Sequence, residues 1–265
     1  MVKLKSWFGK TWTNLKININ HSGQDHTIDL NSGIDLSIPN RFDGNYPTFY
    51  SASAPSVHPV EIGEFVGDLN RGGSCNVKIA SLNIHCTGTH TECIGHIDKS
   101  GTIITDVCPK GFLFSQLITV KPVQKSNVKE SYHVECEKDF VISKESIIGK
   151  IINKTDTLII RTLLNDTAKL NWDYDKNPAP FFTHEAIKFI IEKGIKHLLV
   201  DLPSIDKADD GGQLGNHYRF FEIGKTISEL LFIPDSVQDG LGFLQIQIPN
   251  WGLDAAPSRP IFYPI

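Results

Sequence analysis

Short runs of β-branched and aliphatic residues recur along this chain, whereas only one segment has the period of a clear amphipathic helix. Residues 183–193 place apolar side chains on one stripe, with Thr183 suited to cap the start and Gly194 to end the helix. The strand-like runs are residues 77–86, 116–121, 156–163, 197–202 and 242–249. This pattern predicts a mixed α/β fold with more strand than a simple doubly wound protein carries.

Two further segments complete the expected elements. Residues 26–38 are expected to form short strands around a turn, and residues 219–232 a second helix that contains Glu229. The chain shows no internal repeat and no low-complexity linker. We therefore expect an N-terminal segment over residues 1–25 and a single domain over residues 26–265.

Composition restricts the partners and the compartment. The 265 residues include 26 Lys and Arg against 30 Asp and Glu, a formal charge of −4, which gives no bulk electrostatic case for nucleic acid or an anionic membrane. The basic N-terminus lacks an apolar export core, and the apolar runs are far too short to span a bilayer. Five cysteines without an export signal argue against a disulfide framework. We expect a cytoplasmic protein.

Residues 85–96, His-Cys-Thr-Gly-Thr-His-Thr-Glu-Cys-Ile-Gly-His, concentrate side chains that ligate metals or transfer protons. In an extended chain alternate residues share a face, so four of these side chains would lie together: Cys86, His90, Glu92 and His96. His85 would point to the other face. A straight strand of four residues spans about 13 Å, so Cys86 and His90 reach one ion only if the chain bends between them. Gly88 can supply that bend.

Other interpretations of this segment are weaker. Scattered His and Cys often serve as ordinary polar or core residues, and Cys86 would then be a small buried side chain. A purely structural zinc site usually uses Cys-x-x-Cys pairs, which the segment lacks. Ser204 has no nucleophile-elbow context, which argues against a serine hydrolase.

The segment resembles the signature of the cyclase family of metal-dependent hydrolases, which includes bacterial-type kynurenine formamidase and isatin hydrolase. That signature reads His-x-Gly-Thr-His-x-Asp-x-Pro-x-His. Four positions match, namely Gly88, Thr89, His90 and His96. Three positions differ, because Cys86, Glu92 and Ile94 stand where the family has His, Asp and Pro. Cys and Glu both preserve metal-ligand character.

The resemblance extends over roughly residues 55–265. Residues 139–162 are similar to a helix and strand of the family, and residues 182–206 to its next strand and a Pro-Ser-x-Asp turn. His217 and Glu229 fall where the family has later metal ligands, and residues 256–260 resemble its closing Ala-Pro-x-Arg. The implied fold is the β/β/α swivelling type with a mixed sheet and flanking helices. A homodimer is also implied.

The resemblance implies a metal centre with one or two ions, zinc first and manganese as the alternative. Its expected ligands are Cys86, His90, Glu92, His217 and Glu229. A Cys86 thiolate would favour zinc, because sulfur is the softer donor. His96 is expected to act as the general acid/base, since a histidine titrates near neutrality, and a ligand role for it stays open.

The function that follows is hydrolysis of a carbon–nitrogen bond in a small amide, similar to arylformamidase, with N-formylkynurenine as the first substrate class. A divalent ion lowers the pKa of its water from about 15.7 to about 7, and the resulting hydroxide attacks the carbonyl carbon. Isatin-type lactam hydrolysis and a cyclase or dehydratase activity are the enzymatic alternatives. A metal-binding protein without catalysis and a structural zinc domain are the alternatives from other classes.

Overall fold

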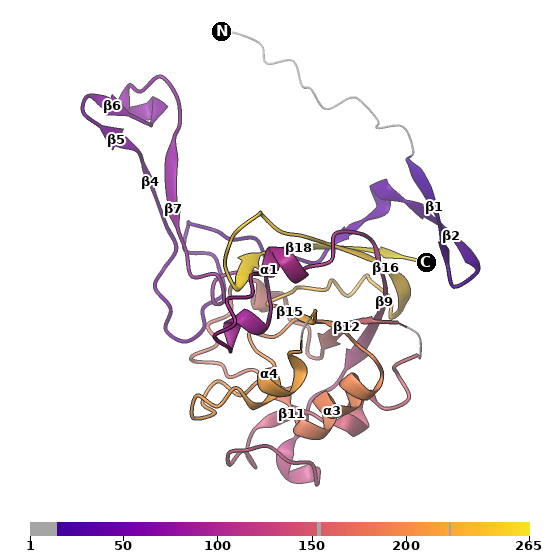
Figure 1. Ribbon diagram of the computed structural model, residues 1–265. Coiled ribbons are helices and arrows are strands. Elements are labelled where there is room, and N and C mark those ends of the chain that lie inside the picture. Colours follow the sequence, from indigo (N-terminus) through magenta and orange to yellow (C-terminus); the bar gives the residue numbers. More distant parts are fainter. Residues whose placement is uncertain (1–14, 153–154, 223) are drawn as a thin grey trace.

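A nine-stranded mixed sheet organises the computed structural model, which describes residues 15–152, 155–222 and 224–265 (Figure 1). Its centre is parallel and its two sides are antiparallel. In spatial order the strands are β17 (Ala255–Pro257), β8 (His90–Glu92), β15 (Thr226–Glu229), β14 (His197–Val200), β12 (Thr157–Thr162), β9 (Leu113–Val120), β16 (Gly240–Gln247), β18 (Arg259–Pro264) and β3 (Ile34–Asp35).

The central strand β12 is buried on both faces. Leu158 and Ile160 belong to one core, which also contains Ala186 and Ile190. Ile159 belongs to a second core on the other face of the sheet. Parallel strands covered on both sides are typically continuous apolar runs, as residues 157–160 are. The expected α/β class with a mixed sheet is confirmed.

The helices are few and short, as the sequence predicts. The longest, α3 (His184–Glu192), begins where Thr183 accepts a hydrogen bond from the Ala186 amide, and Gly194 follows it with φ of +80°. The capping hydroxyl and the left-handed glycine are the signals that predicted this helix. The other α-helices are α1 (Ile104–Val107), α2 (Lys144–Ile147) and α4 (Gly215–Phe220).

The helix predicted over residues 219–232 is wrong. The chain forms α4 and then the strand β15, which lies between β14 and β8. Gly224 adopts φ of +83°, outside the right-handed helical region, so a helix does not continue past it. Residues 226–231 are all buried, which suits a central strand better than a helix with a solvated face.

Three two-stranded hairpins and a small sheet surround this core. The hairpin of β1 (Lys16–His21) and β2 (Gln24–Asp29) contains the predicted boundary at residue 25, and residues 1–14 of the predicted N-terminal segment lie outside the described residues. An arm projects from the body in Figure 1 and consists of β4 (Ser56–Pro59) with β7 (Lys78–Ser81) and β5 (Glu61–Ile62) with β6 (Phe65–Val66). The small sheet contains β10 (Val123–Gln124), β11 (Phe140–Ile142) and β13 (Phe181–Phe182).

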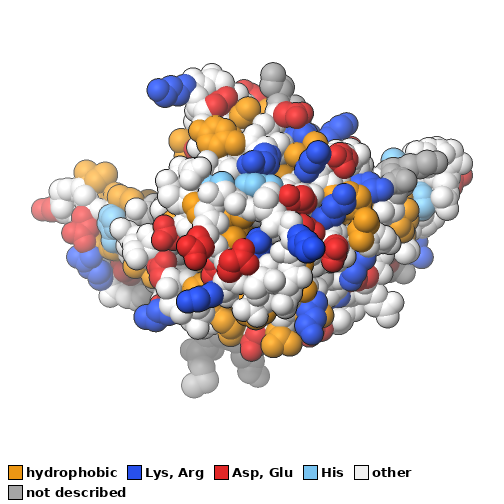
Figure 2. Space-filling model, turned by 90° about the horizontal axis from the view of Figure 1, so that it is seen from below, with side chains coloured by type: hydrophobic (Ala, Val, Ile, Leu, Met, Phe, Trp, Pro, Cys, Tyr) orange, Lys and Arg blue, Asp and Glu red, His pale blue; other side chains and the backbone are white. Residues whose placement is uncertain are grey.

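The surface carries both signs of charge. Figure 2 shows acidic side chains interspersed with lysines and arginines on the face seen from below, where α3 and α4 lie in Figure 1. Within the described ranges, every helix is too short or too polar to cross a bilayer.

Candidate metal centre

The strand β8 brings two of the expected ligands to one face of the sheet. His90 pairs in register with Glu229 on β15, so the two side chains extend from directly opposed positions. Glu92 follows two residues later on the same face of β8. The alternation that the sequence predicted therefore holds for His90 and Glu92.

The imidazole of His90 is buried and has one ring nitrogen available to a metal ion. The residue is fully buried, and its Nδ1 lies 3.2 Å from the Gly88 carbonyl oxygen, which fixes the ring. Its Nε2 lies 3.6 Å from Oε2 of Glu229 and has no hydrogen-bond partner. Buried polar atoms almost always have a partner, so the unpaired Nε2 points to a ligand that is bound there in the working protein.

His217, on α4, faces the same point from another element. Its Nδ1 lies 2.7 Å from Oδ2 of Asp206, and its Nε2 lies 3.1 Å from Oε1 of Glu92 and 3.5 Å from Oε1 of Glu229. Although close to His217, Oε1 of Glu92 is buried and accepts no hydrogen bond. A metal-bound histidine usually has one ring nitrogen held by a carboxylate, as Nδ1 of His217 is, and its other nitrogen directed at the metal site, as Nε2 of His217 is toward the two glutamates.

The backbone is strained on both sides of these ligands. Leu214, directly before α4, has φ of +47°, and Leu230, directly after Glu229, has φ of +55°. Left-handed conformations in bulky residues are costly and concentrate at functional sites. The Leu230 amide donates to the Leu202 carbonyl at 2.8 Å, which helps to hold the end of β15 in place.

His85 and His96 form a second group around Oε2 of Glu92. His85 Nδ1 lies 3.1 Å from Oε2 of Glu92, and His96 Nε2 lies 3.7 Å from the same oxygen. The two imidazole rings stack with centroids 4.3 Å apart. Oδ2 of Asp254 lies 3.2 Å from Nε2 of His85 and 3.3 Å from Nδ1 of His96, so one carboxylate steadies both rings.

The histidines and carboxylates of this cluster shift one another's pKa values. Burial alone would raise the pKa of Glu92, but contacts with His217 and His85 lower it well below its usual value. Burial alone would lower the pKa of His217, but three neighbouring carboxylates raise it well above 6.5. Burial opposes protonation of His85 too, yet Asp254 and Glu92 raise its pKa to about 10. In the metal-free chain, protonated histidines therefore balance the negative charge of the carboxylates. A bound metal cation can supply that positive charge instead.

The structure brings together most of the predicted site residues. Two groups have donor atoms within 4.8 Å of one another and can each hold an ion, namely His90 with Glu92 and Glu229, and His85 with Glu92 and His96. His217 lies against both glutamates of the first group. His96, expected as the acid/base, belongs to the second group.

Cys86 is not brought into either group of described residues. It is buried in an apolar cluster with Phe49, Tyr174 and Leu230, and burial raises the pKa of its thiol to about 12. The chain turns over residues 84–88, and β8 begins only at His90. Strand alternation does not apply before His90, so the inference that His85 faces away is wrong, and the bend occupies a longer stretch than Gly88 alone.

Sequence reasoning missed His85, Asp254 and the acidic, glycine-rich loop of residues 206–212. Asp206 and Asp210 in this loop are buried, with 3% and 1% exposure. Asp210 accepts hydrogen bonds from the amides of Gly212, Gln213 and Leu214 and shapes the entry to α4. The spacing of Asp-x-Gly before a helix was a usable signal of such a turn.

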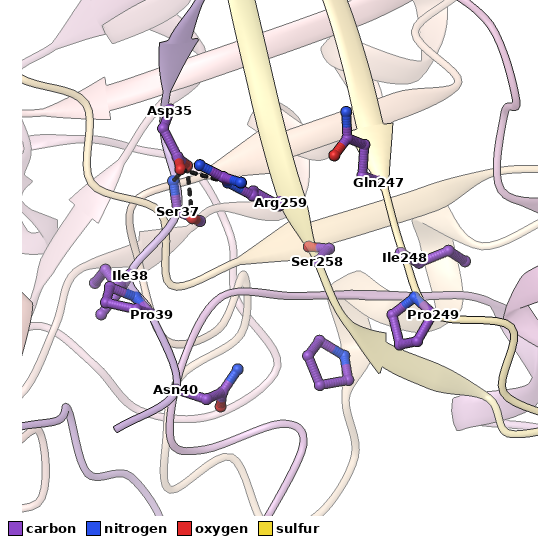
Figure 3. A pocket seen from close by; sticks show the side chains of 11 residues that line it. Asp35, Ser37, Ile38, Pro39, Asn40, Gln247, Ile248, Pro249, Ser258 and Arg259 are labelled. Carbon is purple, nitrogen blue, oxygen red and sulfur yellow. Dashed lines mark hydrogen bonds and ion pairs between the residues drawn. The ribbon is translucent and has the colours of Figure 1, made fainter. Parts of the chain in front are cut away.

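A hollow of the surface lies apart from this cluster. It lies between residues 35–40 and 247–259 and has a volume of about 470 Å³. Figure 3 shows the side chains that line it. Arg259 donates to Asp35 across its wall at 2.6 Å, and none of the residues that line it belongs to either metal-capable group. Arg259, in the Ala-Pro-x-Arg-like segment, is therefore engaged away from the candidate centre.

The aromatic side chains of Trp172, Phe181, Phe182 and Trp251 lie in different parts of the molecule. Phe181 and Phe182 are buried core residues on β13, and Trp251 is 37% exposed. Trp172 lines a small cavity of about 130 Å³ together with Tyr174. Its indole Nε1 is buried and unpartnered.

Comparisons with known proteins place the chain among relatives of known name. The chain is 27% identical over 197 residues to a kynurenine formamidase of Bacillus cytotoxicus. The match covers 74% of this chain and 83% of that protein. It is 26% identical over 238 residues to a kynurenine formamidase of Bacillus cereus, which covers 88% of this chain and 97% of that protein.

Solved structures share the fold. Isatin hydrolase A from Labrenzia aggregata superposes with a TM-score of 0.62 at 19% identity, covering 88% of this chain and 93% of that one. A predicted metal-dependent hydrolase from Bacillus stearothermophilus superposes with a TM-score of 0.59 at 18% identity, covering 88% and 98%. Residues 34–207, more than half of the chain, match the family described as "Putative cyclase". The chain therefore belongs to this cyclase family, as the resemblance of residues 86–96 predicted.

Proposed function

We propose that this protein is a metal-dependent hydrolase of the carbon–nitrogen bond in a small amide, with an aryl formamide such as N-formylkynurenine as its substrate. The observation that carries the proposal is the convergence of His90, Glu92, His217 and Glu229 on one buried point where Nε2 of His90 has no partner. The names of the relatives from Bacillus cytotoxicus and Bacillus cereus support the choice of a formamide.

The side chains present fit one or two divalent ions. With one ion bound, His90, Glu92, Glu229 and His217 would be its ligands and His96 would be left for proton transfer. A second ion would take His85, Glu92 and His96, and His96 would then be a ligand and not the acid/base. Glu92 can serve both, because Oε1 faces His217 and Oε2 faces His85. These nitrogen and oxygen donors suit zinc, and the carboxylates also suit manganese. The zinc preference that a Cys86 thiolate would add is absent from both ligand groups.

The chemistry expected of such a centre is hydrolytic. A bound divalent ion lowers the pKa of a coordinated water and polarises a substrate carbonyl. The chain's own groups supply orientation and proton movement: Asp206 holds Nδ1 of His217, and the Ile205 amide donates to Oε1 of Glu229 at 2.9 Å. His96 is 27% exposed at its side chain and is the imidazole that we assign to proton transfer toward the leaving nitrogen.

Metal analysis and turnover on one preparation test the proposal. Purified protein is expected to contain at least one equivalent of zinc or manganese and to cleave N-formylkynurenine. His96→Ala should keep its metal and lose turnover, whereas loss of one equivalent would assign His96 as a ligand. His58→Ala, on the exposed arm, is the matched control. Turnover that survives in His96→Ala would reject its acid/base role.

The same assay separates the alternatives. Isatin-type lactam hydrolysis is the second candidate, favoured by the structural likeness to isatin hydrolase A, and it predicts faster cleavage of a lactam than of a formamide. A cyclase or dehydratase would act on neither bond. Bound metal without turnover of amides, lactams or lactones would favour a non-catalytic metal-binding protein, and a saturated four-coordinate zinc would favour a structural domain.

The single domain over residues 26–265, the homodimer and the cytoplasmic location stay predictions. Limited proteolysis, the solution mass of the full chain and cell fractionation are their respective tests.

A further inference from the structure

Asp206, behind the candidate metal centre, receives an unusual number of hydrogen bonds. The side chain is buried, and its Oδ2 accepts from Nδ1 of His217 at 2.7 Å and from the His217 amide at 3.0 Å. The Asn216 amide lies 2.9 Å from Oδ1 and 3.1 Å from Oδ2. The remaining donor is the hydroxyl of Tyr132, 2.8 Å from Oδ1, and it alone comes from a distant part of the chain.

Tyr132 is itself fixed from several sides. Its hydroxyl oxygen accepts a hydrogen bond from the Lys207 amide at 2.8 Å, so its proton is directed toward Asp206. Its ring packs on Phe181 with centroids 4.6 Å apart and on His133 and His184 at 4.2 and 5.0 Å. Burial, and then the charge of Asp206, raises the pKa of Tyr132, so the phenol remains a proton donor at neutral pH.

We propose that Tyr132 is a positioning residue for the metal centre, which acts through Asp206 on His217. By occupying Oδ1, the phenol hydroxyl keeps Oδ2 turned toward Nδ1 of His217. That contact holds the proton on Nδ1 and presents Nε2 to Glu92 and Glu229. The inference rests on the proposed function, because it assigns His217 as a ligand.

One physical effect gives the hydroxyl its influence. The hydrogen bond to Oδ1 restricts rotation of the carboxylate about its Cβ–Cγ bond, so Oδ2 stays aligned with Nδ1 of His217. Outer partners of metal-binding histidines change metal affinity by about 10–100-fold when they are removed. A side chain that only fills space would not have this effect.

The test uses Tyr132→Phe in the full chain, because this change removes the hydroxyl and keeps the packed ring. Tyr263→Phe is the matched control, since Tyr263 is a buried tyrosine that packs against Ile28 and Phe243 instead of the metal centre. Asp206→Asn serves as the positive reference, and thermal unfolding establishes that each variant is folded. Two measurements are made on every variant.

The first measurement uses metal-free protein. The proton on Nδ1 of His217 is buried in a 2.7 Å hydrogen bond and should give a downfield, slowly exchanging resonance that His217→Gln lacks. In Tyr132→Phe this resonance should move upfield or broaden. The second measurement is the dissociation constant for Zn²⁺ and for Mn²⁺ by chelator competition. It should rise about tenfold or more in Tyr132→Phe and stay unchanged in Tyr263→Phe.

The outcomes separate this inference from the proposed function. A folded Tyr132→Phe protein with the wild-type resonance and a dissociation constant within about twofold of wild type overturns the inference, because the backbone amides would then suffice to hold Asp206. If the wild-type chain binds neither ion, the proposed metal function fails. In that case the His217 resonance alone decides whether Tyr132 positions the imidazole.

Discussion

At the residue scale, two neighbours exchange the roles that strand alternation assigns to them. Cys86 occupies the family's first histidine position but is buried among apolar side chains, whereas His85 contacts Glu92 and Asp254. The exchange follows from the turn at residues 84–88, which places the chain out of the extended geometry on which alternation depends.

Metal content should therefore respond to His85 and not to Cys86. His85→Ala removes a donor of the group that also contains Glu92 and His96, so the bound metal should fall by up to one equivalent. Cys86→Ser keeps the size of the side chain and should retain wild-type content. Elemental analysis after dialysis measures both, with His58→Ala as the control. Normal metal in His85→Ala together with loss in Cys86→Ser would restore the cysteine as the ligand.

A second residue, His197, links stability to pH far from the ligands. It is 7% exposed, and its Nδ1 lies 2.9 Å from Oγ1 of Thr226. Burial lowers its pKa from 6.5 to about 4. Between pH 6.5 and about pH 4, His197 binds a proton in the unfolded chain but not in the folded chain. The free energy of unfolding should therefore fall by about 2–3 kcal/mol as the pH drops through this range.

His197→Gln removes this titration and provides the comparison. The variant should be less stable than wild type at pH 7, since it alters a packed side chain. The gap in free energy of unfolding between the two proteins should narrow as pH falls toward 4. Denaturant unfolding at several pH values measures the gap. A gap that stays constant over this range would show that His197 does not titrate as the burial argument requires.

At the element scale, the elements that local interactions stabilise were predicted from local sequence signals. The helix α3 was predicted within a residue or two, because the Thr183 cap, the apolar stripe and Gly194 all lie in the helix or within two residues of its ends. The strands β9, β12, β14 and β16 also have continuous or alternating apolar runs. The pairing of β15 with β8 joins residues more than 100 positions apart, and the polar residues Glu222, Thr226 and Glu229 made residues 219–232 resemble an amphipathic helix.

The candidate site shows the same division. His90 and Glu92 were predictable, because two residues on one short strand share a face whatever the rest of the chain does. The assignments of His217 and Glu229 needed the family resemblance, since twelve residues of unknown path separate them. Asp206, Asp254 and Tyr132 were not found as site residues, because their contribution is a contact made only after the chain folds.

A buried charge pair connects the ends of two central strands. The Lys169 ammonium donates to Asp201 at 2.8 Å and to the carbonyl and hydroxyl oxygens of Thr162 at 3.0 and 2.9 Å. Asp201, after β14, is fully buried and also accepts from the Thr162 amide at the end of β12. The pair therefore joins β12, β14 and the turn that contains Lys169.

Asp201→Ala should destabilise the protein by about 3–5 kcal/mol, because it leaves the Lys169 charge buried without its partner. Lys169→Met should also be destabilising, but the double variant should lose less than the sum of the two singles. Equilibrium unfolding in denaturant gives all four free energies. Losses that add would mean that the two charges do not interact, which the 2.8 Å contact argues against.

At the scale of the whole molecule, the candidate centre joins segments that are distant in sequence. His90 and Glu92 come from the first half of the chain, while His217 and Glu229 lie more than 120 residues later. An ion held by these four side chains would bind the folded arrangement and not the unfolded chain, so its binding free energy would add to stability.

Removal of metal should therefore lower the melting temperature of the whole protein. At a free ion concentration about 100 times the dissociation constant, binding adds about 2.7 kcal/mol, which corresponds to a shift of about 5–10 °C for a chain of this size. Calorimetry before and after dialysis against a chelator measures the shift, and added Zn²⁺ or Mn²⁺ should reverse it. His58→Ala should behave as wild type does. His90→Asn should melt at the same temperature with and without metal, because it lacks the buried Nε2 at the centre of the cluster. An equal shift in His90→Asn would place the stabilising ion elsewhere and separate the thermal effect from the candidate centre.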